Sequence, residues 1–127
     1  MYEELGNWFP FAQTLNNLAT IDIEKGNYTK ALKSLDSCLA IIGSGNPELA
    51  ELVYLNKYNL YSKLNDDSKA LKFYLIHDSI QEMIHELKKE ELMADMEMKY
   101  QNEKKQAQIY ALEWEKAQKQ KRGNIIL

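Results

Sequence analysis

Residues 67–122 decide the fold, and they read DSKALKFYLIHDSIQEMIHELKKEELMADMEMKYQNEKKQAQIYALEWEKAQKQKR. This stretch contains no Gly and no Pro, and it is rich in Ala, Leu, Glu, Lys, Gln and Met, which favour helix. As one helix it is expected to be about 80 Å long, at ~1.5 Å per residue. A compact globule of this chain's length is roughly half as wide. The helix is therefore expected to leave the globule or to fold back on it.

Apolar side chains recur along this stretch at the three- and four-residue spacing of one helix face. The first half carries a dense stripe made of Ala70, Phe73, Tyr74, His77, Ile80, Ile84 and Leu87. The second half thins to Met96, Tyr100, Ala107, Tyr110, Trp114 and Ala117, with charges on the other sides. So narrow a stripe cannot form a core alone, so we expect it to lie along another helix, from a second chain or from this one. We predict a homodimer whose seam consists of Ile84, Leu87, Met96, Tyr100, Ala107, Tyr110 and Trp114.

Shorter helical stripes precede the long one, and turn signals separate them. Turns are expected at Gly26-Asn27, at 43–46 and at Asn65-Asp66, with Pro47 in the first turn of the helix that follows. Residues 1–7 look like the end of an earlier helix that Gly6 stops. No segment alternates with period two, so the predicted fold class is all-α.

Three regions follow from these patterns. We place helical repeats in residues 1–78, a helical coiled-coil stalk in 79–122 and the start of a membrane helix in 123–127. Ser79 and Glu82 have the spacing of a capping box, which leaves a break of the long helix near Asp78 as an alternative to a continuous helix.

One part of the sequence resembles a tetratricopeptide repeat. The resemblance lies in Leu15-Asn16-Asn17-Leu18-Ala19, Gly26-Asn27-Tyr28, Ala31-Leu32, Leu35 and Cys38-Leu39. It gives one unit at about 12–45 and a second at about 51–84, where Tyr54, Tyr58, Tyr61, Ala70 and Tyr74 fall in matching places. Lys57 and Asp67 depart from the Leu and Tyr that are usual in the family. The resemblance implies two helical hairpins, which the long helix or a second chain is expected to cap.

The same resemblance implies a peptide-binding face on the first helix of each hairpin. The polar residues in matching positions are Asn16, Asn17, Thr20, Asn56, Asn59 and Lys63. Asn17 and Asn56 occupy the same repeat position, where some family members hold the backbone of a ligand. The alternative is that these asparagines serve helix packing.

Residues 72–105, with Lys72-Phe73-Tyr74, Asp78-Ser79-Ile80 and Met96-Glu97-Met98-Lys99-Tyr100, are similar to the linker of Bacteroidetes-type membrane regulators. In those proteins periplasmic repeats and a coiled coil precede a membrane helix and a histidine kinase or helix-turn-helix output. The resemblance implies a membrane helix beginning near Ile125-Ile126-Leu127, after the basic residues Lys116, Lys119, Lys121 and Arg122. Without it, the basic cluster is a solvated helix end whose cations favour the helix dipole.

The sequence offers no nucleophile–base pair and no cofactor loop. His85-Glu86-Leu87-Lys88 is similar to the phospho-acceptor box of histidine kinases but lacks the proline that follows there, so we expect His85 on a helix surface. His77 lies eight residues from it, off a common ligand face. Cys38 is the single cysteine, and a net charge of −3 gives no case for nucleic acid. We predict no catalytic residue, no metal and no cofactor.

Together these patterns predict a non-catalytic sensor or protein-interaction segment of a membrane-bound signalling protein. It would bind a protein or peptide through its repeats and dimerise through its stalk, in the periplasm. The alternative is a soluble, cytoplasmic scaffold or adaptor that has neither membrane helix nor output domain.

Overall fold

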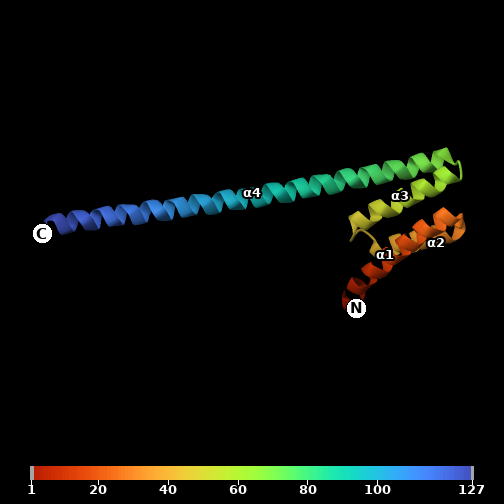
Figure 1. The fold of residues 1–127 in the computed structure, drawn as a ribbon, viewed down its shortest axis with the longest axis horizontal. Coiled ribbons are helices and arrows are strands. Elements are labelled where there is room, and N and C mark those ends of the chain that lie inside the picture. Colours follow the sequence, from red (N-terminus) through yellow and green to blue (C-terminus); the bar gives the residue numbers. More distant parts are fainter. Residues whose placement is uncertain (1, 127) are drawn as a thin grey trace. The chain divides into compact units, whose positions relative to one another are not determined.

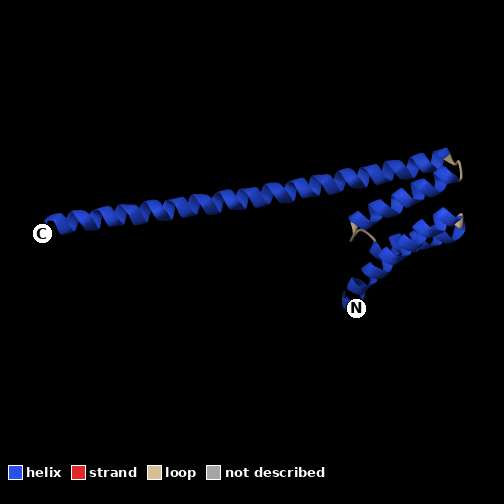
Figure 2. Ribbon diagram, in the orientation of Figure 1, coloured by secondary structure: helices blue, strands red, loops and turns tan. Residues whose placement is uncertain are grey.

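A computed structural model gives the backbone of residues 2–126 and the side chains of residues 9–123. Four helices follow one another: α1 (Tyr2–Lys25), α2 (Tyr28–Ile42), α3 (Pro47–Lys63) and α4 (Asp67–Ile126). Figure 1 shows them in sequence order, and Figure 2 shows that short loops join them. No strand occurs between residues 2 and 126. The predicted all-α class is therefore confirmed, whereas the assignment of the helix pairs to tetratricopeptide repeats stays a prediction.

The three turns lie where the sequence signals placed them. Gly26 and Gly43 adopt positive φ values of 81° and 52°, which cost glycine little because it has no Cβ. Asn65 adopts φ 58° at the third turn, and Asn is one of the few other residues that tolerate this region. Asn46 caps α3, since its side chain accepts a hydrogen bond of 3.1 Å from the backbone N–H of Leu49.

The predicted helix end at Gly6 is wrong, because α1 runs from Tyr2 to Lys25 and contains both Gly6 and Pro10. Inside a helix a glycine costs about 1 kcal/mol and a proline about 3 kcal/mol relative to alanine. These costs are small enough for the favourable helix formation of the residues on either side to exceed them, so a glycine or proline does not always end a helix. The long helix also continues through Asp78 without a break at the Ser79 capping box.

The chain divides into two compact units, Met1–Glu86 and Leu87–Leu127. In the first unit α1 packs against α2 and α3, and α2 packs against α3. Small side chains line this interface and let the helix backbones approach closely, while Leu35, Val53 and Leu60 fill the space between them. The buried apolar residues are Ala12, Ala19, Ile23, Ala31, Leu35, Cys38, Ile42, Leu49, Val53, Leu60, Ala70 and Ile84.

Aromatic rings join α3 to the first turns of α4. The ring of Phe73 lies between those of Tyr54 and Tyr61, with centroid distances of 6.1 and 5.4 Å. Tyr58 and Tyr74 make a tilted pair at 5.3 Å. Such pairs stabilise a fold by about 0.5–1.5 kcal/mol each beyond the area that they bury. The first turns of α4 thus pack with α3, and the first unit includes α4 up to Glu86.

A lysine fills the place where the family resemblance implies leucine. The stem of Lys57 is largely buried, and its ammonium lies 5.0 Å from the ring centroid of Phe73. The same ammonium makes a 2.6 Å ion pair with the carboxylate of Asp36 on α2. The side chain thus packs as an apolar stem and keeps its charge paired at the edge of the core.

The second unit begins at Leu87, and α4 supplies its structure as far as Ile126. Between residues 87 and 123 every side chain is exposed except that of Gln118, which is half-buried. The expectation that this region lies along another helix stays a prediction. Its pairing with a second copy of the chain is proposed below.

Candidate binding site

A buried polar network connects α1 to α3. The amide nitrogen Nδ2 of Asn56 donates to Oδ1 of Asn16 at 2.9 Å and to Oγ1 of Thr20 at 3.0 Å. It also lies 3.4 Å from the backbone oxygen of Asn16, to which the Thr20 hydroxyl donates at 3.2 Å. Both asparagines are buried. The two N–H groups of the Asn56 amide are thus satisfied across the helix interface, as a buried amide requires.

An open pocket of about 320 Å³ lies beside this network, between the C-terminal halves of α1 and α3. The lining residues are Thr20, Ile23, Glu24, Asn56, Tyr58, Asn59, Ser62 and Lys63. Most of them are polar, and one acidic and one basic side chain face the same space. Amide and hydroxyl groups can both donate and accept hydrogen bonds, so the pocket can match polar groups of either kind.

The structure brings five of the six predicted binding residues to this pocket or beneath it. Thr20, Asn56, Asn59 and Lys63 line it, and Asn16 lies under it in the bonded network. Asn17 is exposed and does not line the pocket, so the residue that faces Asn56 is Asn16 and not its neighbour. Successive side chains are about 100° apart around a helix axis, so Asn16 lies on the α3 face of α1 and Asn17 on its outer side.

Four lining residues were not predicted: Ile23, Glu24, Tyr58 and Ser62. A local signal for two of them exists in the sequence. Glu24 lies four residues after Thr20, and Ser62 lies three residues after Asn59, so each shares a helix face with a predicted residue. The position of Tyr58 depends on how α3 meets α4, where its ring contacts Tyr74.

The two histidines occupy different environments. His77 is buried, and its Nε2 lies 3.4 Å from a carboxylate oxygen of Glu51 on α3. Its Nδ1 has no hydrogen-bond partner among the described residues. His85 is exposed on α4, where sequence reasoning placed it. Among the described residues no three His, Cys, Asp or Glu side chains come together as metal ligands would.

The predicted dimer seam is only partly exposed. Ile84 is 7% exposed and buried in the first unit, so it is not available to a partner. Leu87 is exposed, but a heptad counted back from Tyr100, Ala107 and Trp114 places it on the opposite side of the helix from them. The seam residues that share one exposed face are Met96, Tyr100, Ala107, Tyr110 and Trp114.

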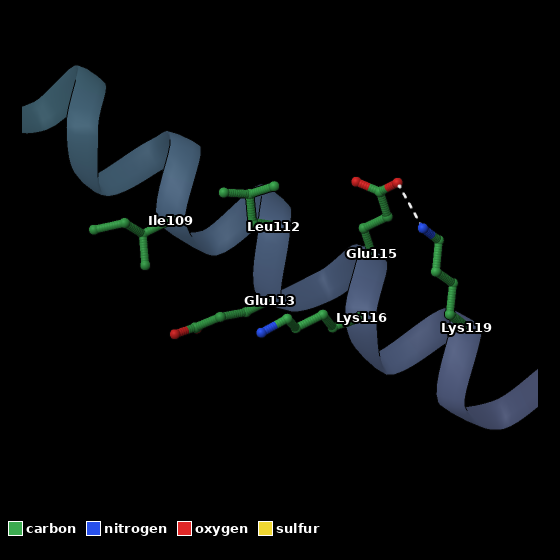
Figure 3. A pocket seen from close by; sticks show the side chains of 6 residues that line it. All are labelled: Ile109, Leu112, Glu113, Glu115, Lys116 and Lys119. Atoms are coloured by element: carbon green, nitrogen blue, oxygen red, sulfur yellow. Dashed lines mark ion pairs between the residues drawn. The ribbon is translucent and has the colours of Figure 1, made fainter.

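A hollow runs along another side of α4 in the second unit. Figure 3 shows its lining residues, Ile109, Leu112, Glu113, Glu115, Lys116 and Lys119, all on one helix. The dashed line in Figure 3 marks the ion pair between Glu115 and Lys119, at 3.7 Å. One helix alone cannot surround a ligand, so this hollow is a furrow between side chains rather than a binding cavity.

The membrane prediction rests on the end of the chain. Among the described residues, no helix combines the length and the apolar character that crossing a bilayer demands. The proposed start of a membrane helix at Ile125-Ile126-Leu127 lies outside the residues whose side chains the structure describes.

Comparison of the chain with protein-family models, with curated proteins and with solved structures found no match.

Proposed function

We propose that this chain is a protein-interaction segment. The first unit binds an extended peptide of a partner in the pocket between α1 and α3, and the exposed stripe of α4 joins two copies of the chain. The observation that carries the proposal is the network of Asn16, Thr20 and Asn56, which forms a fixed polar floor next to the free side chains of Asn59 and Lys63.

The chemistry of the pocket favours a peptide over a small apolar ligand. Small-molecule sites are enclosed and mostly apolar, with a few polar groups. This pocket is open, and seven of its eight lining residues carry an amide, hydroxyl or charged group. An extended peptide presents unpaired N–H and C=O groups at short intervals, and each needs a partner when it leaves water. Asn59 and Ser62 can supply such partners, while Lys63 and Glu24 can select charges on the peptide.

Joining two copies would strengthen this binding without any change in the pocket. Two linked sites raise the effective concentration of the second binding step when a partner presents two peptides. In a membrane-bound regulator the same event would be the sensing step, and in a soluble adaptor it would bridge two partners.

Selection from a random peptide library displayed on phage tests the binding site. Peptides selected on the unaltered chain should bind the double variant Asn59→Ala, Lys63→Ala about 30-fold more weakly, because two hydrogen bonds of about 1 kcal/mol each are lost. Lys33→Ala is the matched control, since Lys33 is exposed on α2 and lies outside the pocket. Equal affinities for the double variant and the unaltered chain would reject the pocket.

A further inference from the structure

The exposed face of α4 carries a longer heptad pattern than the predicted seam. With Tyr100, Ala107 and Trp114 at position a, Met96, Glu103, Tyr110 and Ala117 fall at position d, and Met93 begins the pattern. Seven of the eight a and d positions from 93 to 117 are thus apolar or aromatic, and all eight are exposed. Such a seam, kept over more than three heptads, favours a partner helix with the same spacing.

The charges of the second unit differ between its two halves. Residues 87–103 carry three basic and five acidic side chains, a net charge of −2. Residues 104–122 carry six basic and two acidic side chains, a net charge of +4. A second copy in the opposite direction would place each half beside a half of opposite sign. A second copy in the same direction would place like beside like.

Individual positions give the same preference. In a parallel pair in register, Glu103 at position d would face Glu103 of the partner copy. Lys99 at position g would lie beside Lys104 at position e of the partner copy. Both contacts join like charges, and the first would do so inside the seam, where water cannot screen them well.

An antiparallel pair removes both contacts. The register that overlaps the whole seam places Ala107 opposite Glu103, Tyr100 opposite Tyr110 and Met96 opposite Trp114 of the partner copy. The small Ala107 then leaves room for the Glu103 side chain to reach solvent. Lys99 comes beside Glu113 of the partner copy, and this attraction occurs twice by symmetry. One repulsive contact remains, between the two copies of Lys104.

We propose that residues 93–117 of two copies of this chain pair as an antiparallel coiled coil, with Ala107 of each copy opposite Glu103 of the other. The proposal deepens the proposed function, on whose pairing of two copies it rests. The C-terminal ends of two antiparallel helices point in opposite directions, whereas two stalks that enter one membrane side by side must point the same way. The antiparallel pairing therefore favours the soluble adaptor over the membrane-bound regulator.

Disulfide cross-linking of the full chain tests the direction. In a Cys38→Ala background, a tagged Met93→Cys chain and an untagged Ala117→Cys chain are mixed and oxidised. The expected product is the mixed disulfide, because these positions face each other in the antiparallel register. Ala107→Cys alone should give no disulfide, since its partner position is 103. Cross-linking of Ala107→Cys to itself, without the mixed product, would overturn the proposal in favour of a parallel pair.

A charge-exchange series gives a second readout that needs no cysteine. Glu113→Lys should weaken dimerisation about tenfold in sedimentation analysis, because two attractions become repulsions. Adding Lys99→Glu should restore the original affinity. Glu115→Lys is the control, as position b lies outside the seam. An unaltered chain that sediments as a monomer, or no recovery in the double variant, would refute the pairing. If that monomer still binds the peptide, only the pairing of two copies is refuted, and the peptide pocket of the first unit stands.

Discussion

Replacing Asn56 by alanine is expected to loosen the contact between α1 and α3. The substitution removes the bonds from Asn56 Nδ2 to Asn16 Oδ1 and to Thr20 Oγ1, at 2.9 and 3.0 Å. The bond to Thr20 contributes about 1 kcal/mol net, and the Asn16 oxygen left buried without a donor costs about 1–3 kcal/mol. Because Thr20 keeps its own bond to the backbone of Asn16, we expect the free energy of unfolding to fall by about 2–4 kcal/mol.

Urea unfolding followed by far-ultraviolet circular dichroism measures this loss. Hydrogen exchange in peptides from α1 and α3 shows that the transition belongs to the first unit. Asn59→Ala is the matched control, because Asn59 is exposed on the same helix, and its effect should stay within about 0.5 kcal/mol.

A double-mutant cycle separates the network from two independent residues. Asn16→Ala with Asn56→Ala removes donor and acceptor together, so its cost should be smaller than the sum of the single costs by about 1–2 kcal/mol. Additive costs, or an Asn56→Ala chain as stable as the control, would refute the assignment of these residues to one buried network.

Three further predictions concern the packing, the pH dependence and the turns, and urea unfolding tests each of them. Lys57→Leu should change stability by less than about 1 kcal/mol, because leucine can fill the buried space that the apolar stem of Lys57 occupies. Asp36→Ala should lower stability by about 1 kcal/mol, because it leaves the Lys57 ammonium without its partner. A larger loss of stability in Lys57→Leu than in Asp36→Ala would contradict this account of the Lys57 side chain. Burial raises the pKa of the Cys38 thiol from its ordinary 9.0 to about 11, so its contribution to stability is complete below pH 9 and is lost as the pH rises to 11. The unaltered chain should therefore lose more stability than Cys38→Ala between pH 8 and 11, and equal losses would speak against the shift. Gly26→Ala should cost about 1 kcal/mol through its positive φ alone, because no atom lies within 4 Å of an added Cβ. Gly123→Ala, inside α4 and equally free of neighbours, should instead be neutral or increase helix content, and a similar loss at both glycines would contradict the role of φ.

The candidate site was partly predictable through the resemblance to a tetratricopeptide repeat. The resemblance pointed to Asn56, Asn59 and Lys63 on α3 and to Thr20 on α1, all of which line the pocket. It could not choose between Asn16 and Asn17, since each continues a polar face of α1. The choice depends on the rotation of α1 against α3, which the packing of side chains forty residues away determines.

The sequence by itself determined the helices and most of their ends. Turn residues such as Gly26 and the Asn46-Pro47 pair act on the few residues around them, so their effect can be read locally. The apolar spacing of residues 93–117 likewise depends only on the period of a helix. Gly6 shows the limit of such signals, since a small local penalty does not end a helix.

Only the tertiary structure decided which side chains are used inside the first unit. Ile84 belongs to the same stripe in the sequence as Leu87, yet the first is buried and the second exposed. Lys57 became a buried stem only because the ring of Phe73 and the carboxylate of Asp36 meet there from two other helices. Helix formation follows from short-range propensities. The partners of a side chain instead follow from how whole helices cross, which depends on many weak contacts between distant residues.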